Sequence, residues 1–385
     1  MIDELKRLLD DLETRLDAWQ QRTTHELHAR ALRFEPVERL PILFQYPAPA
    51  DGPFKPFPHR EAFNDPRKML FNELVHAFET SICHHHRVGD DLPFTIRANC
   101  GTIVIASLFG GRWEQHNDDP PWARPYESLD AIRAVFDIDP LDFTRGICPR
   151  IIDTYRYYAE ALAGCPNVRR CVSTVLPDLQ GPFDNAELLR GSEIYIDLIE
   201  QPDLVRRLLE HMVRAQVGFA RFLEDLIHEQ YDGFCHQHAT ALPGHILIRN
   251  DTPINISPAM YREHVAEHDE AVLSRMGGGG IHFCGKGDHL VPEILKLPSL
   301  TAIDLGQPLM NDLDRVYARC AERRIPIVRL RVSEEEILAG RVRQRFPTGV
   351  SLVHAVASIE RAREMTAGPI APTNPGSNEN PSGGG

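Results

Sequence analysis

Short β-rich runs alternate with longer helical patterns along most of this chain, and this alternation limits the fold more than any other feature. The clearest strand candidates are Ile42–Tyr46, Pro93–Ala98, Cys171–Val175, Gly233–His238, Gly280–Cys284, Thr301–Leu305 and Ile325–Arg331, with a further one near Gly349. Strands that alternate with helices predict a parallel sheet with right-handed crossovers. This many strands suit a closed barrel better than an open sheet. We therefore predict an α/β fold of the (β/α)8 TIM-barrel class.

Two helices have boundaries that the sequence predicts. The segment from Pro202 to Ile227 carries apolar residues at helical spacing on one face. A second helix is predicted to begin at Ser257-Pro258, because serine is a favoured cap and proline is favoured in the first turn. It should end at Gly277–Gly280, since glycine ends helices readily.

The two ends of the chain differ from its middle. Apolar residues three or four apart mark one amphipathic helix near the start: Leu5, Leu8, Leu9, Leu12, Leu16 and Trp19. We predict that residues 1–35 are a helical extension packed on the barrel and that residues 36–367 form the barrel. Residues 368–385 offer almost nothing to bury and are predicted to be a disordered tail.

Charge and composition exclude some classes of function. The chain of 385 residues has 55 acidic and 42 basic side chains, a formal net charge of −13, which argues against a nucleic-acid partner. No signal peptide is evident, and no apolar stretch approaches the ~20 residues that span a bilayer. We expect a cytoplasmic protein without a membrane partner. In that setting most of the eight cysteines should be buried, and a special one is more often a metal ligand than half of a disulfide.

The most informative string for chemistry runs from Gly280 to His289 and reads GIHFCGKGDH. If its first part is a strand, His282 and Cys284 point to the same face. In a barrel that face is the interior, at the strand ends where active sites form. An imidazole and a thiolate presented together are half of a zinc site. The spacing alone leaves open a packed histidine beside an inert buried cysteine.

Four segments occur in an order that resembles the uroporphyrinogen decarboxylase superfamily. They are Asp90–Gly101, Asp178–Asp184, Asn250-Asp251 ahead of Ile256-Ser-Pro258, and the His-Phe-Cys-Gly string. The resemblance covers roughly residues 39 to 365. It implies a barrel and one of two chemistries. One is cofactor-free decarboxylation of uroporphyrinogen, and the other is zinc-dependent methyl transfer between a corrinoid protein and a thiol such as coenzyme M.

The chain departs from both branches of that superfamily. The decarboxylases carry an Arg-Gln-Ala-Gly-Arg stretch that grips substrate carboxylates, whereas Phe44–Ala50 contains no arginine. The methyltransferases have a His-x-Cys pair like His282 and Cys284 and a later cysteine, whereas Arg345–Ser351 contains none. The resemblance therefore supports half of a zinc site and leaves the other ligands open.

Other residues are candidates for the remaining zinc ligands. His236 and His238 share one face if their strand is regular, and they would converge with His282 and Cys284 from a neighbouring strand. Asp251 is a candidate carboxylate ligand or general acid/base. The alternative is that one of these histidines only makes hydrogen bonds inside the barrel.

Further polar residues follow the predicted strands and are candidates for substrate contact or catalysis. The candidate substrate-binding residues are Arg97, Asn99, Gln180, Arg249, Asp288 and His289. The candidate catalytic residues are Asp91, Asp178 and Asp251. For Arg97 and Asn99, a role in capping the core is an equally open alternative.

Zinc-type methyl transfer from a corrinoid partner to a thiol or related acceptor is the function we expect. A metal lowers the pKa of a bound thiol, so that a nucleophilic thiolate exists at neutral pH. Two alternatives stay open. One is cofactor-free decarboxylation of uroporphyrinogen or another carboxylated substrate, with Asp90 or Asp91 steadying a pyrrole and Arg97 and Arg249 holding acetate groups. The other is a barrel that binds a ligand without catalysis.

Overall fold

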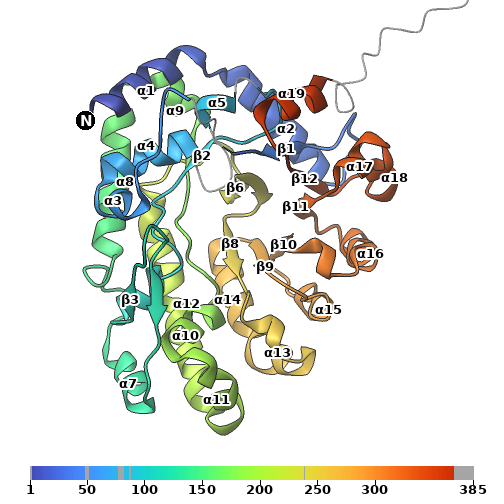
Figure 1. The fold of residues 1–385 in the computed structure, drawn as a ribbon. Coiled ribbons are helices and arrows are strands. Elements are labelled where there is room, and N and C mark those ends of the chain that lie inside the picture. Colours follow the sequence, from blue (N-terminus) through green and yellow to red (C-terminus); the bar gives the residue numbers. More distant parts are fainter. Residues whose placement is uncertain (1, 48–51, 77–81, 86–87, 238, 368–385) are drawn as a thin grey trace, which may run out of the picture.

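The computed structural model describes residues 2–47, 52–76, 82–85, 88–237 and 239–367, and its centre is a parallel β-sheet (Figure 1). Six strands pair in the order β1-β12-β11-β10-β9-β8, and each neighbouring pair is parallel. The strands are β1 (Ile42–Gln45), β8 (Ile246–Arg249), β9 (Gly279–Phe283), β10 (Leu300–Leu305), β11 (Ile327–Arg331) and β12 (Val350–Ala355). Helices separate successive strands of this sheet, so the predicted α/β class is confirmed.

A second parallel pair lies beside β1. It consists of β2 (Thr95–Ile96) and β5 (Ser173–Thr174), both shorter than predicted. The residues before β2 bind to β1 directly. The Asp91 N–H donates to the Ile42 carbonyl at 2.9 Å, and the Asp90 carboxylate accepts from the Phe44 N–H at 2.7 Å. These bonds place the β2–β5 pair next to the free edge of β1.

An antiparallel hairpin precedes β8 in the chain. It consists of β6 (Phe234–Gln237) and β7 (Thr240–Pro243). The sequence predicted β6 but neither β7 nor β8, because both are short runs that follow one another closely. The hairpin, helix α2 (Ala18–Leu32) and the sheet bury one group of apolar side chains: Ala29, Leu32, Phe234, Cys235, Ala241, Leu242, Leu247, Ala302 and Val328.

Helices surround the sheet, and Figure 1 shows α15 to α18 in chain order along its right-hand side. Between β1 and β5, the elements other than β2 are α3 (His59–Asn64), α4 (Pro66–His76), α5 (Ile82–His85), α6 (Val104–Leu108), a hairpin of β3 (Arg112–Glu114) and β4 (Trp122–Arg124), α7 (Leu129–Ala134), η1 (Val135–Asp137), α8 (Cys148–Leu162) and α9 (Pro166–Cys171). Between β5 and β6 they are α10 (Pro182–Arg190), η2 (Gly191–Glu193), α11 (Ile194–Glu200) and α12 (Pro202–Glu224). After β8 they are η3 (Pro253–Asn255), α13 (Pro258–His264), α14 (Ala266–Met276), α15 (Val291–Ile294), η4 (Pro308–Met310), α16 (Leu313–Arg323), α17 (Glu334–Leu338), α18 (Arg341–Arg345) and α19 (Ile359–Ala367).

The N-terminal extension is two helices and not one. These are α1 (Asp3–Arg15) and α2 (Ala18–Leu32). Asp17 separates them, since its carboxylate accepts from the Trp19 N–H at 2.8 Å and caps the second helix. The five leucines of the predicted stripe are buried, but Trp19 is 64% exposed. Assigning Trp19 to that stripe was therefore wrong, because the helix axis changes before it.

The other predicted helix boundaries are largely confirmed. The Ser257 hydroxyl accepts from the Met260 N–H at 3.2 Å, and the helix end at Gly277 has the left-handed φ of +82° that glycine tolerates. The long segment between them is interrupted at Val265, which separates α13 from α14. The other helix, α12, ends at Glu224 and so before the predicted Ile227.

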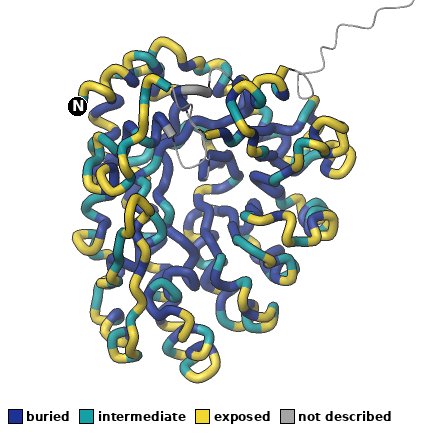
Figure 2. Tube along the Cα trace, in the orientation of Figure 1, coloured by how far each residue is buried: buried dark blue, intermediate teal, exposed yellow. Residues whose placement is uncertain are grey.

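Buried residues follow the strands and the inner faces of the helices (Figure 2). Among the described residues, no helix combines the length and apolar composition that crossing a membrane requires. The predicted disordered tail, residues 368–385, lies outside the described residues.

Candidate metal centre

The ends of three neighbouring strands place polar side chains in one row. Arg249 on β8 is paired in register with His282 on β9, which is paired with Asp304 on β10. Residues in register on neighbouring parallel strands point to the same face of a sheet. All three side chains are buried. Buried charged groups require partners, so three such side chains side by side mark a candidate functional site.

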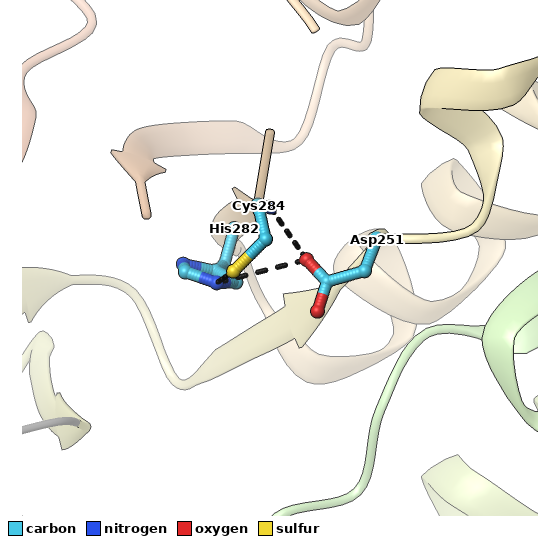
Figure 3. A group of neighbouring side chains, drawn as sticks. All are labelled: Asp251, His282 and Cys284. Carbon is cyan, nitrogen blue, oxygen red and sulfur yellow. Dashed lines mark hydrogen bonds and ion pairs between the residues drawn. The ribbon is translucent and has the colours of Figure 1, made fainter. Parts of the chain in front are cut away.

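Asp251, His282 and Cys284 converge just beyond the ends of β8 and β9 (Figure 3). Their ligand atoms all lie within 4.8 Å of one another. The His282 Nε2 is 3.3 Å from the Cys284 Sγ and 3.7 Å from the Asp251 Oδ1. His282 is buried, whereas Asp251 and Cys284 are partly exposed. In the part of the chain that the structure describes, this is the one cluster of three or more such residues with metal-ligand spacing.

Asp304 fixes the orientation of the His282 ring. Its Oδ2 accepts a hydrogen bond from the His282 Nδ1 at 2.8 Å, and Asp304 is fully buried. This bond holds the Nδ1 proton and directs Nε2 toward Cys284 and Asp251. A carboxylate behind a histidine is the usual arrangement at metal-ligating histidines.

The surroundings of His282 favour a positive charge. Burial lowers the pKa of His282, but the charge of Asp304 and its hydrogen bond, the hydrogen bond with Cys284 and the charge of Asp251 outweigh burial and raise this pKa to about 10. A divalent cation would supply positive charge at the same place. The nitrogen, sulfur and oxygen donors present are the three atom types that bind zinc.

Two loops are shaped around the three ligands. The Asp184 carboxylate on α10 holds the loop that contains Asp251. It accepts from the backbone N–H groups of Asp251 and Thr252 at 2.9 and 3.1 Å. The Asp251 Oδ1 in turn accepts from the Cys284 N–H at 2.6 Å. On the other side, a Cβ at Gly306 would lie 2.6 Å from the Cys284 Sγ. Any larger residue at position 306 would therefore displace the thiol from its present position.

The predicted histidines of β6 are not brought to this centre. His236 lies beside α2, where its Nδ1 is 2.7 Å from the Glu229 Oε2 and its ring is 6.5 Å from the His25 ring. His238 lies outside the described residues. His236 is not at the centre because strand β8, which was not predicted, lies beside β9 where β6 was expected.

Three other predicted residues form a buried network next to the centre. The Arg249 Nε is 3.0 Å from the Asp178 Oδ2, and the Gln180 Nε2 donates to the Asp178 Oδ1 at 2.6 Å. The Arg249 Nη2 also donates to the Gln237 Oε1 at 3.2 Å. Burial lowers the pKa of Arg249, against the charge of Asp178. Asp178, Gln180 and Arg249 are thus brought together, with Arg249 in register with His282.

Arg97 and Asn99 are organised by a residue that sequence reasoning missed. The Glu73 carboxylate accepts from the Arg97 N–H at 3.0 Å and from the Asn99 Nδ2 at 3.3 Å. Glu73 is buried, and burial raises its pKa. It sits within α4 without a motif around it, so nothing in the local sequence distinguishes it from a surface residue. The charge of Arg97 also acts on Arg249, so these two arginines lie within electrostatic reach of each other.

The remaining predicted residues lie in loops. Asp91 binds the Arg39 Nη2 at 2.8 Å and accepts from the Ile42 N–H at 3.0 Å, which ties it to the start of β1. In the loop after β9, the Asp288 N–H donates to the Asn311 Oδ1 at 3.0 Å, and His289 is bonded to the Ile256 carbonyl at 3.2 Å. Asp304 and Asp184 were missed, although an aspartate inside the apolar run of Thr301–Leu305 was a usable signal for the first.

Comparison with known proteins gives no assignment. No protein-family model matches this chain, and no curated protein matches it. The functional argument therefore depends on the geometry around Asp251, His282 and Cys284.

Proposed function

We propose that Asp251, His282 and Cys284 hold a zinc-type divalent metal ion and that the protein transfers a methyl group from a corrinoid to a thiol or related acceptor. The observation that carries the proposal is the convergence of a carboxylate, an imidazole and a thiol within 4.8 Å. Catalytic zinc sites have three protein ligands and one position open to water or substrate. The corrinoid as methyl donor follows from the resemblance to the uroporphyrinogen decarboxylase superfamily.

The chain's own residues have distinct parts in this proposal. Asp304 keeps the proton on the Nδ1 of His282, so that Nε2 is the atom available as a ligand. Asp184 and the Cys284 N–H hold Asp251 in place. When bound, the metal would lower the pKa of an acceptor thiol and so supply a nucleophilic thiolate. Asp251 and Cys284 are the partly exposed members, so substrate would approach from their side.

We also propose that the strands belong to a closed (β/α)8 barrel. In this proposal the β2–β5 pair continues the six-stranded sheet beyond β1, which gives eight strands in the order β5-β2-β1-β12-β11-β10-β9-β8. Side chains link the two ends of this series. The Gln237 Nε2 donates to the Leu176 carbonyl just after β5, while its Oε1 accepts from Arg249 on β8. In such a barrel the centre lies at the carboxyl ends of the strands, where barrel enzymes have their active sites.

Metal analysis tests the proposal directly. Protein purified without chelator and dialysed with zinc is expected to retain about one metal ion per chain. The same protein, incubated with methylcobalamin and a thiol, is expected to convert the corrinoid at a rate that follows metal content, as measured by its visible spectrum. A metal content near zero after zinc addition would exclude the proposed centre. Full metal content without methyl transfer would keep the centre and reject the reaction.

Decarboxylation of a carboxylated substrate is the second candidate, and one observation favours it. The charge of Arg97 contributes to lowering the pKa of Arg249, which lies in register with His282, and arginine side chains suit substrate carboxylates. Against a tetrapyrrole substrate, the carboxylates of Asp90 and Asp91 bind Phe44, Ile42 and Arg39 at β1. Anaerobic incubation with uroporphyrinogen decides the matter, because release of coproporphyrinogen at enzyme-like rates would place decarboxylation first.

A further inference from the structure

A cavity of about 600 Å³ lies between α6, β3 and the start of α8, away from the metal ligands (β3 and α8 in Figure 1). Its lining residues are Ser107, Leu108, Gly110, Gly111, Trp113, Arg145, Gly146, Ile147, Pro149 and Arg150. The two charged residues of this lining are both arginines. In a chain of net charge −13, a cavity with only positive charges on its wall marks a local preference for anions.

Both arginines are held in place by backbone carbonyl groups. The Arg145 Nε donates to the Leu108 carbonyl at 3.2 Å, and the Arg150 Nη1 donates to the Phe63 carbonyl at 3.3 Å. The Arg150 guanidinium also lies over the Phe63 ring, 4.4 Å from its centroid. Within the described ranges of the chain, neither arginine forms an ion pair. An arginine has five N–H donors, so each guanidinium keeps donors for a ligand beside the one that binds the carbonyl.

Ser107 connects two of the segments that line the cavity. The buried Ser107 hydroxyl accepts from the Ile147 N–H at 3.1 Å and donates to the Val104 carbonyl at 2.8 Å. A Cβ at Gly146 would lie 2.5 Å from Ser107, so only glycine permits this contact between α6 and the segment before α8. The cavity is thus built by specific contacts and is not a gap between mobile side chains.

An aromatic surface adjoins the arginines. The half-buried Trp113 lines the cavity, and its ring packs edge-on against Phe63 at 5.3 Å, the same ring that Arg150 covers. Trp113 also lines an adjoining hollow of about 750 Å³ together with Tyr126. Aromatic rings of a ligand stack favourably on tryptophan, so the cavity combines an anion site with a ring site.

We propose that this cavity binds a phosphate monoester that carries an aromatic ring, with the phosphate between Arg145 and Arg150 and the ring against Trp113. The planar forks of two guanidinium groups match the oxygen geometry of a phosphate. The volume falls within the roughly 300–1,000 Å³ typical of small-molecule sites, whereas an inorganic phosphate would fill only a small part of it. This site is separate from the metal centre and does not depend on the proposed methyl transfer.

Trp113 is itself the reporter for the test. Trp19 and Trp122 are 64% and 69% exposed, so Trp19→Phe and Trp122→Phe together leave Trp113 as the single tryptophan with little effect on the fold. Titration of this protein with phenyl phosphate is expected to change its fluorescence in a saturable manner. Arg145→Gln, at an exposed position, is expected to weaken the affinity roughly tenfold or more. Arg156→Gln, on α8 and outside the cavity lining, is the control: Arg156 pairs with Asp153, and its loss should leave the affinity for phenyl phosphate unchanged.

Titrations with three different ligands test the anion site and the ring site separately. Inorganic phosphate is expected to bind more weakly than phenyl phosphate, and phenol is expected not to bind. Equal affinity for inorganic phosphate would overturn the ring site, and an unchanged affinity in both Arg145→Gln and Arg150→Lys would overturn the anion site. Circular dichroism shows whether each variant is folded. Zinc content should be the same in Arg145→Gln and the parent protein, which distinguishes this site from the metal centre.

Discussion

At the scale of single residues, Cys284 carries the sharpest prediction. Cys284→Ala is expected to abolish tight metal binding and to leave the fold intact, because the centre lies on a scaffold with its own core. The measurement is zinc content together with the melting temperature of metal-free protein. Cys320→Ala is the control: Cys320 is fully buried and distant from the centre, so its loss should cost ~1 kcal/mol of stability and no metal. Unchanged zinc content in Cys284→Ala would contradict the assignment.

Asp304 is expected to act through His282 and not on substrate. Asp304→Asn removes the charge that raises the His282 pKa to about 10, so this pKa should fall toward its ordinary value. Loss of such a carboxylate typically weakens metal binding about 10- to 100-fold. The checks are an NMR titration of the His282 ring in metal-free protein and a competitive zinc titration. A purely structural Asp304 would lower stability without moving either quantity.

At the scale of elements, the turn after β10 packs directly against two of the proposed ligands. Gly306→Ala would place a Cβ 2.6 Å from the Cys284 Sγ and 3.2 Å from the His282 Cε1. Since that spacing cannot be accommodated without displacing the thiol, zinc affinity is expected to fall while the helical content stays unchanged. Gly164→Ala is the matched control, because no atom lies within 4 Å of its added Cβ. Equal zinc affinity in the two variants would show that the turn does not constrain the site.

The docking of α14 on the loop after β8 makes stability depend on pH. Asp269 on α14 accepts from the Tyr261 hydroxyl at 2.7 Å and from the Asn250 side chain. Burial, against these two hydrogen bonds, raises its pKa from 3.8 to about 7. Between these values the folded chain keeps a proton that the unfolded chain releases, so the contribution of Asp269 is full below about pH 4 and is lost as the pH rises through about 7.

Asp269→Asn is expected to remove this dependence, since an amide keeps the shape without the charge. Urea unfolding at pH 5 and pH 7 should show a smaller loss of stability in the variant than in the parent protein. Asp130→Asn, with a side chain 90% exposed, should leave the difference between the two pH values unchanged. An identical pH dependence in Asp269→Asn and the parent would contradict the assignment.

At the scale of the whole molecule, the N-terminal helices belong to the core. Gln21 on α2 donates to the Leu92 carbonyl at 3.3 Å and accepts from the Phe94 N–H at 3.2 Å, and His28 bonds the Asp91 carbonyl at 2.9 Å. Deletion of residues 1–32 would expose this surface. The truncated chain is expected to lose its cooperative melting transition, measured by circular dichroism and size-exclusion chromatography. A truncated chain that melts cooperatively and binds zinc would show that the extension is dispensable.

Much of the candidate centre could be predicted from local pattern. The alternation of side chains along one strand places His282 and Cys284 on one face, and the structure brings their Nε2 and Sγ to 3.3 Å. Asp251 was a candidate ligand from its place in a loop that follows the predicted strand of His236 and His238, and it joins the pair. The support of these ligands by Asp304, Asp184 and Gly306 was not predicted, because each of them acts from a segment distant in sequence.

What the sequence alone determined is the alternation of helices and strands and the common face of His282 and Cys284, because both depend on the spacing of neighbouring residues. Only the tertiary structure decided which strand lies beside β9. Strand pairing depends on hydrogen bonds between segments far apart in the chain, and the short β8 took the place expected for β6. As a result Arg249 is in register with His282, whereas His236 lies beside α2. Strand order thus decided which side chains surround the centre. It depends on contacts between distant segments, so no local pattern predicts it.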